Sequence, residues 1–261
     1  MRPTTVPAKA VTPYRDFVTP APKCWSGGSR IGISAQKRKA MLLRMIGKGM
    51  LVYLIIAASW AAIALGDAMP AVPPAPTGLS ARQIAILLKV EDPTFYQHHG
   101  LSLADGQGFA TISSAVANQV FLSGRSLDGI EGAFQALYRG AFNCCKHVDV
   151  GRDVMALVLN ARLSKDKQLA LYVSEVYMGT NRGGQVKGLA SAAQSYLGKP
   201  LAQLTEPEFI GLVAMIKAPN QYHPISNPAA HAQRAARIQA LVDGKCKPAG
   251  WFDTSYTQCA P

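Results

Sequence analysis

The chain has 261 residues, nearly half of them hydrophobic, which is enough for one domain with a sizeable core plus appendages. Its net charge is +12, but residues 1–48 hold ten Lys and Arg against Asp16 alone. Residues 49–261 carry 17 basic and 14 acidic side chains, so the composition excludes a strongly basic nucleic-acid-binding domain, and no nucleic-acid partner is expected.

The N-terminal region is predicted to be a membrane anchor. Residues 1–48 lack a clear apolar period and are expected to form a disordered, basic cytoplasmic tail. Residues 49–66 (GMLVYLIIAASWAAIALG) contain no charge and are long enough to cross a bilayer once, with positive charges preceding them. The alternative is a cleaved signal peptide, because small residues occur at 64–68. Residues 67–79 are rich in proline and predict a stiff linker.

The exported part is predicted to be all-α, with a globular domain over residues 80–243 and a tail over 244–261. Apolar residues recur at helical spacing, and Ser or Thr precedes several of these segments as a helix cap. The predicted helices cover residues 80–90, 111–122, 130–138, 154–162, 165–177, 189–197, 206–217 and 229–242.

Of the five cysteines, Cys24 falls in the predicted cytoplasmic tail, and the others would face an oxidising space. A bridge between Cys246 and Cys259 would close a loop in the C-terminal tail. Pairing between the adjacent Cys144 and Cys145 is disfavoured because it is strained. The spacing of cysteine and histidine does not match a metal site.

One short segment combines acidic, aromatic and imidazole groups: Glu91-Asp92-Pro93-Thr94-Phe95-Tyr96-Gln97-His98-His99-Gly100. Glu91 comes at the end of a predicted helix, where it could lie at the rim of a cleft. A carboxyl group beside apolar Val90 and Phe95 can have a raised pKa and accept a proton near neutral pH. The alternative interpretation is an exposed helix end with solvated acids.

This segment resembles the first signature of the membrane peptidoglycan glycosyltransferases, the glycan-polymerising domains of class A penicillin-binding proteins and the monofunctional transglycosylases. Three further blocks agree with that family in the same order, so that the resemblance covers roughly residues 80–243. They are residues 161–179 (ARLSKDKQLALYVSEVYMG), 188–199 (GLASAAQSYLGK) and 212–224 (LVAMIKAPNQYHP).

The resemblance implies a mostly helical, lysozyme-like fold that elongates glycan chains from lipid II and inverts the anomeric carbon in a single displacement. Glu91 takes the role of general base towards the 4-hydroxyl of the acceptor sugar. Asp92, Phe95 and His98 shape or orient the substrate-binding site. The resemblance also implies a divalent cation, Mg or Mn, at the pyrophosphate.

The second family signature is only partly present in residues 108–119 (GFATISSAVANQ). Thr111 and Ser113 keep their hydroxyl groups as candidate substrate-binding residues, whereas two glutamines and a phosphate-binding lysine of the family are absent. Arg125 aligns with a family arginine that faces the pyrophosphate. Arg152 and Arg162 are the other arginines that could replace the lysine, because a guanidinium suits an oxyanion.

The second catalytic acid of the family is displaced. Counting back ten residues from Arg162 gives Arg152, with Asp153 next to it. Glu131 is the other candidate, and its alternative interpretation is an exposed helix charge. The segment between Gly100 and Gly108 is also shorter than the corresponding segment of the family. In the family this segment forms part of the small lobe that lies next to the membrane.

Three functions therefore remain open. The first is a monofunctional peptidoglycan glycosyltransferase, single-pass in the cell inner membrane with its domain on the periplasmic side. Its partners would be lipid II, the growing glycan chain and other cell-wall synthesis enzymes. The second is a catalytically weakened or inactive scaffold that binds lipid II or cell-wall enzymes. The third is a lysozyme-like hydrolase that uses Glu91 with Asp153 or Glu131, two carboxylates across one cleft.

Overall fold

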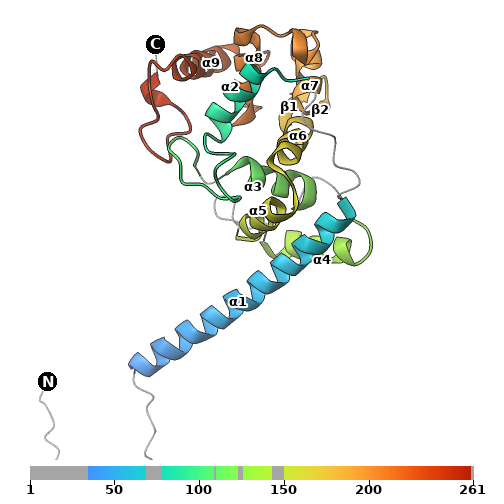
Figure 1. The fold of residues 1–261 in the computed structure, drawn as a ribbon, viewed down its shortest axis with the longest axis vertical. Helices are drawn as coiled ribbons and strands as arrows, with labels where there is room; N and C mark the ends of the chain where they lie inside the picture. The colour runs from blue at the N-terminus through green and yellow to red at the C-terminus, as the bar shows by residue number, and fades with distance from the viewer. Residues whose placement is uncertain (1–34, 69–77, 109, 123–125, 143–149, 260–261) are drawn as a thin grey trace, which may run out of the picture. The chain divides into compact units, whose positions relative to one another are not determined.

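The computed structural model describes residues 35–68, 78–108, 110–122, 126–142 and 150–259 (Figure 1). The chain separates into two compact units, Met1–Met45 and Ile46–Pro261. Arg125, Cys24, Cys144 and Cys145 lie outside the described residues, as do residues 1–34 of the predicted tail and most of the predicted linker.

The described N-terminal helix, α1 (Ala35–Ala68), contains a stretch that is long and apolar enough to cross a membrane, Gln36–Ala62 with a mean hydropathy of 1.8. It includes most of the predicted anchor at residues 49–66. The prediction of disorder up to residue 48 was wrong for residues 35–48, which are helical. They consist mainly of Ala, Lys, Arg, Leu and Met, which are strong helix formers, so they form a helix although they lack a clear apolar period.

The all-α prediction is confirmed. The segments 111–122 and 189–197 were each predicted as one helix. In each of them a short α-helix is followed by a π-helical segment, Ala117–Leu122 and Ala193–Leu197 respectively. After α1 the helices are α2 (Ala81–Glu91), α3 (Ile112–Val116), η2 (Ala117–Leu122), α4 (Gly129–Phe142), α5 (Val150–Arg162), α6 (Lys165–Glu175), α7 (Leu189–Ala192), η3 (Ala193–Leu197), η4 (Leu201–Gln203), α8 (Glu206–Ile216), α9 (Pro228–Val242) and η5 (Thr257–Cys259).

Hydroxyl side chains fix where four of these helices begin. Ser80, Thr111 and Thr205 each form a capping box, in which the cap side chain and the third helical residue bond each other's backbone N–H groups. Ser164 caps α6 by accepting from the Lys167 amide. The caps at Ser80 and Ser164 lie at the beginnings of predicted helices, and both helices carry residues of the site described below.

A two-stranded antiparallel hairpin was not predicted. Strands β1 (Tyr177–Asn181) and β2 (Gly184–Lys187) pair across a turn in which Arg182 and Gly183 both have positive φ. Strands this short carry too few residues for an alternating pattern to stand out.

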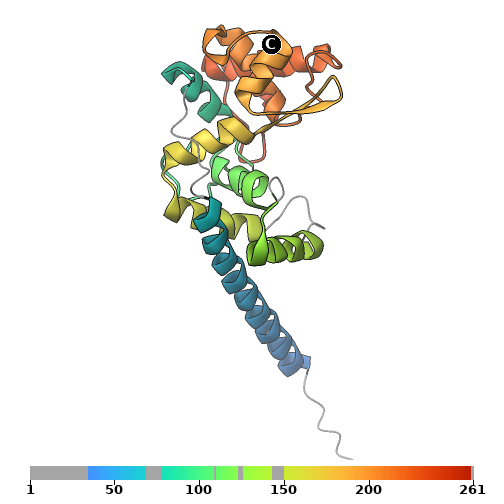
Figure 2. The same ribbon diagram turned by 90° about the vertical axis from the view of Figure 1, so that its right-hand side faces the viewer.

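The core is built mainly on α8, whose side chains from Phe209 to Met215 are all buried. Helix α8 packs against α9 and α2, while α3 packs against α5 and α6. Figure 2 shows the same two groupings from the side, with α8 and α9 together at the end that carries the C-terminus. Because α2 packs on both α8 and α9, its C-terminal end is held next to residues from the last third of the chain.

Candidate active site

Glu91 is the last residue of α2 and faces a cavity of about 460 Å³. Its neighbour Val90 is buried and anchors this end of the helix in the core. The carboxylate of Glu91 accepts a hydrogen bond of 2.9 Å from the hydroxyl of Tyr172 on α6. Burial raises the pKa of Glu91 above its usual value, and the Tyr172 bond and the positive charge of Arg234 offset part of that rise. The result is a carboxyl group suited to accept a proton.

The adjacent carboxylate, Asp92, is fully buried and points elsewhere. It accepts hydrogen bonds of 2.9 Å from the backbone amide of Ile112, at the start of α3, and from Nε2 of His98. Because Nδ1 of His98 accepts from the Gly100 amide, Nε2 carries the ring proton and the imidazole is neutral in this arrangement. Asp92 therefore joins the end of α2, the 98–100 turn and α3.

The other signature residues are also buried. Phe95 is 1% exposed and lies under the ammonium group of Lys165. The hydroxyl of Thr111 donates to the Gly100 carbonyl, and that of Ser113 donates to Gln168. Phe95, Thr111 and Ser113, like Asp92 and His98, are absent from the described lining of the cavity. The geometry supports positioning by these residues, and their effect on substrate binding stays a prediction.

The charged side chains among the described lining residues are one carboxylate, Glu91, and three cations, Arg152, Lys217 and Arg234. Arg152 pairs with Asp153 through two hydrogen bonds of 2.9 and 3.0 Å. The cavity is therefore predominantly cationic, with a single acidic group against its wall. Such a balance suits an anionic ligand that has a proton-donating group next to it.

Arg234, on α9, is 2% exposed. Its guanidinium donates to the carbonyls of Ala214 and Thr254 and lies 5.0 Å from the ring centre of Tyr222. Within the described part of the chain it forms no ion pair with a carboxylate. Burial lowers its pKa, which the negative charge of Glu91 counteracts. A buried cation without a carboxylate partner is costly, and a bound anion would remove that cost.

Lys217 follows the end of α8 and is partly open to solvent. Its ammonium group donates to the hydroxyl of Ser255 at 2.6 Å. Burial of part of the side chain, followed by the charge of Arg234, lowers its pKa to about 8. Lys217 is therefore charged at neutral pH and can interact with an anion at the cavity rim.

The remaining predicted residues do not gather at this cavity. Arg162 ends α5 and is exposed, while Glu131 lies in the first turn of α4, where its backbone carbonyl accepts from Trp60. Neither is among the described lining residues. Asp153 is also outside the lining and is paired with Arg152. Arg152, one of the arginines predicted to replace the missing lysine, does line the cavity.

Two cations of the site, Lys217 and Arg234, were missed from the sequence. Arg234 precedes Ile238 by four residues and Leu241 by seven, and both of these are buried. This spacing puts the arginine on the apolar face of α9, which is a detectable signal for a buried cation. Lys217 directly follows an almost entirely apolar helix, which brings a charge to the end of a core element.

Part of the chain is similar to known proteins. Residues 149–242 match the family described as Transglycosylase. Penicillin-binding protein 1B of Escherichia coli K12 is 32% identical over 159 residues, covering 60% of this chain and 18% of that protein. Penicillin-binding protein 1B of Vibrio cholerae is 32% identical over 170 residues (60% and 19%), and penicillin-binding protein 1A of Pseudomonas aeruginosa is 29% identical over 165 (58% and 17%).

The matched regions span less than a fifth of the length of each of these relatives. The family nevertheless agrees with the one indicated by the signature residues around Glu91. The matched residues 149–242 include Arg152, Lys217 and Arg234, the three cations of the cavity. This part of the chain is therefore similar to the family described as Transglycosylase.

Proposed function

We propose that this chain is a peptidoglycan glycosyltransferase that polymerises lipid II into glycan strands, with Glu91 as its general base. The observation that carries the proposal is the cavity, in which one carboxylate of raised pKa faces three cations. The names of the relatives and the family match add support: all three relatives are penicillin-binding proteins, and residues 149–242 of this chain match the family described as Transglycosylase.

The reaction requires a base for the acceptor hydroxyl and positive charge for the departing pyrophosphate. Glu91 takes the proton of the acceptor 4-hydroxyl as this oxygen attacks the anomeric carbon of the donor. The bond between that carbon and the pyrophosphate oxygen breaks at the same time, and its electron pair leaves with the pyrophosphate. Arg152, Lys217 and Arg234 stabilise the charge that develops on the leaving group.

A two-carboxylate hydrolase is less well supported. Glycosidases hold two carboxyl groups across one cleft, and Glu91 is the single carboxylate among the described residues that line this cavity. The divalent cation implied by the resemblance stays a prediction. Within the described ranges, no group of three His, Cys, Asp or Glu side chains could hold a metal ion, and no step above depends on one.

We further propose that α1 anchors the chain in the inner membrane as a single span, with the glycosyltransferase domain on the periplasmic side. Basic residues at 37–48 precede the most apolar part of α1, which favours a cytoplasmic N-terminus. The disulfide between Cys246 and Cys259 fits an oxidising compartment. Protease accessibility of the C-terminal domain in spheroplasts tests this orientation, and protection of the domain from protease would contradict it.

Polymerisation of lipid II by the purified full-length chain in detergent tests the catalytic proposal. We expect glycan strands from the wild type and a loss of at least about a hundredfold in rate for Glu91→Gln, which keeps the size of the side chain but cannot accept the proton. Glu175→Gln, at the end of α6 and outside the described cavity lining, is the matched control and should retain the wild-type rate.

Absence of polymer from the wild type would contradict the proposal. If the wild type and Glu91→Gln then bound lipid II equally well, the scaffold function would be favoured. Association with other cell-wall synthesis enzymes stays a prediction from the resemblance.

A further inference from the structure

The C-terminal segment 244–259 forms one wall of the cavity, although the family match ends at residue 242. It contributes Phe252, Thr254 and Tyr256 to the lining. This wall is therefore a feature of the present chain that the matched family region does not include. Its chemistry differs from the cationic side, because these three residues are aromatic or carry a hydroxyl group.

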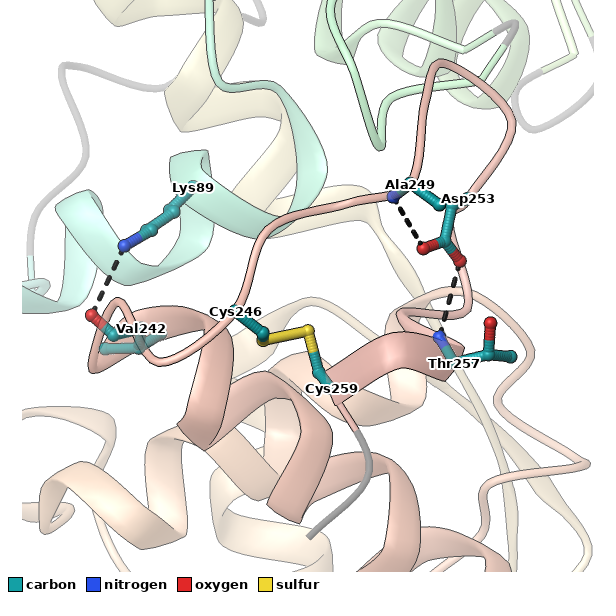
Figure 3. Close-up of a disulfide and its surroundings, with 7 residues drawn as sticks. All are labelled: Lys89, Val242, Cys246, Ala249, Asp253, Thr257 and Cys259. Atoms are coloured by element: carbon teal, nitrogen blue, oxygen red, sulfur yellow. Dashed lines mark hydrogen bonds between the residues drawn. A yellow bond between two sulfur atoms is a disulfide. The ribbon is translucent and has the colours of Figure 1, made fainter.

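The segment is firmly attached to the domain. The disulfide between Cys246 and Cys259 closes it, and Asp253 bonds the backbone amides of Ala249 and Thr257 within the loop (Figure 3). The hydroxyl of Tyr256 donates to the carbonyl of Val90 at 2.7 Å, directly before Glu91 in the chain. These contacts give the wall a defined position beside the proposed base.

The same loop also fixes residues 106–108. The backbone amide of Gly106 donates to the Gly250 carbonyl at 2.9 Å, and that of Gly108 donates to the Trp251 carbonyl at 2.8 Å. A side chain at Gly106 would approach Pro248 to 2.7 Å, so the two segments are in close contact. Gln107 is held between these two bonds and lines the cavity.

The amide group of Gln107 has no hydrogen-bond partner within the described residues, at either its nitrogen or its oxygen. The residue is 5% exposed, so water around it is restricted. Buried amides in folded proteins are nearly always hydrogen-bonded, and an unpaired one in a cavity indicates a group that a ligand can satisfy. Gln119, on η2, brings a second unpaired amide oxygen to the same cavity.

Phe252 supplies the complementary apolar surface. It lines the same cavity and is 64% exposed, which is unusual for a phenylalanine in a folded domain. An exposed aromatic ring that lines the same cavity as a neutral amide suits a sugar ring, whose faces carry C–H groups and whose edges carry hydroxyl and acetamido groups. An acetamido group both donates and accepts, as does the Gln107 side chain.

We propose that Gln107 and Phe252 form a saccharide subsite for an N-acetylated sugar of the glycan. The subsite deepens the proposed glycosyltransferase function and rests on it for the identity of the sugar. The cationic residues would hold the pyrophosphate, and the neutral wall made by the C-terminal loop would hold a sugar ring. The loop therefore acts in binding as well as in stability.

Binding of a soluble, uncharged oligosaccharide to the full-length chain in detergent tests the subsite without requiring turnover. Titration calorimetry with the β-1,4-linked tetramer of N-acetylglucosamine should show binding by the wild type. The affinity should fall by about tenfold in Phe252→Ala and in Gln107→Ala. Maltotetraose, which lacks acetamido groups, should bind at least about tenfold more weakly than the N-acetylated tetramer.

Two further variants separate loss of the subsite from loss of fold or of catalysis. Gln107→Glu keeps the side-chain shape but replaces the amide donor with an anion, and it should also weaken binding while circular dichroism stays unchanged. Glu175→Gln, at the end of α6 and outside the described cavity lining, should bind the tetramer as the wild type does. Failure of the wild type to bind, equal affinity in Phe252→Ala and Gln107→Ala, or equal binding of maltotetraose would overturn the subsite. None of these results bears on polymerisation, which the lipid II assay measures.

Discussion

The hydrogen bond from Tyr172 to Glu91 should set the pH range in which the enzyme works. The bond is 2.9 Å long and stabilises the charged form of the carboxylate, which lowers the pKa of Glu91 against the effect of burial. Tyr172→Phe removes the hydroxyl and leaves the rest of a side chain that is 2% exposed, so the packing changes little. Glu91 should then remain protonated up to higher pH.

A hydrogen bond to a charged group contributes about 1.5–3 kcal/mol, and the lower value applies here because Glu91 faces an open cavity. A loss of about 1.5 kcal/mol corresponds to a shift of about one pH unit. The acidic limb of the pH profile of kcat/KM for lipid II polymerisation should therefore move up by about one unit, since this limb reports the base of the free enzyme.

Tyr96→Phe is the matched control, because it removes the same atom from a different tyrosine. The hydroxyl of Tyr96 donates to Asp166 at 3.1 Å, and the residue is 55% exposed and outside the described cavity lining. Its profile should match that of the wild type. An acidic limb that stays in place in Tyr172→Phe, or moves to lower pH, would refute both the role of the bond and the assignment of Glu91 as base.

Three other predictions concern charge, cross-linking and backbone. Because the pKa of Lys217 is about 8, this lysine loses its proton as the pH rises through that value, and binding of pyrophosphate should weaken above pH 8. Lys217→Arg stays charged and should retain its affinity for pyrophosphate there. Calorimetry at pH 7 and pH 9 measures both affinities. Replacement of Cys246 and Cys259 by serine opens a loop with a sequence separation of 13 and should lower the free energy of unfolding by about 3 kcal/mol, measured by denaturant titration. Gly100→Ala should destabilise the fold by about 2 kcal/mol or more, measured by thermal unfolding, because φ is +114° and the added carbon would lie 2.7 Å from the Ala156 carbonyl oxygen.

The parts of the site that depend on local sequence could be predicted. The beginning of α2 is encoded by the capping box at Ser80, and its length then determines that Glu91 ends it. The predicted disulfide between Cys246 and Cys259 is confirmed, and it could be predicted because the two cysteines are close in sequence. In each case the information lies within about a dozen residues.

The cationic side of the cavity depends on contacts between distant segments. Arg234 is 143 positions after Glu91, and nothing in the spacing of either residue indicates that α9 and the end of α2 are neighbours. The same holds for Gln107, whose position depends on the backbone bonds from its neighbours Gly106 and Gly108 to the C-terminal loop. Backbone pairing between irregular segments leaves no pattern of side chains in the sequence.

The adjacent residues Glu91 and Asp92 have different positions in the fold: Glu91 faces the cavity, and Asp92 holds neighbouring segments together. Asp92 follows the last helical residue with φ −160° and ψ 79°, so the backbone leaves the helical path directly after Glu91. Asp92 accepts hydrogen bonds from Ile112 and His98, is fully buried and is not among the described residues that line the cavity. Glu91 accepts one bond from Tyr172 and keeps free lone pairs towards the cavity. For Asp92 to face the cavity instead, it would have to give up the hydrogen bond that holds the start of α3. The hydrogen bonds of Asp92 therefore help to hold Glu91, the proposed base, at the cavity.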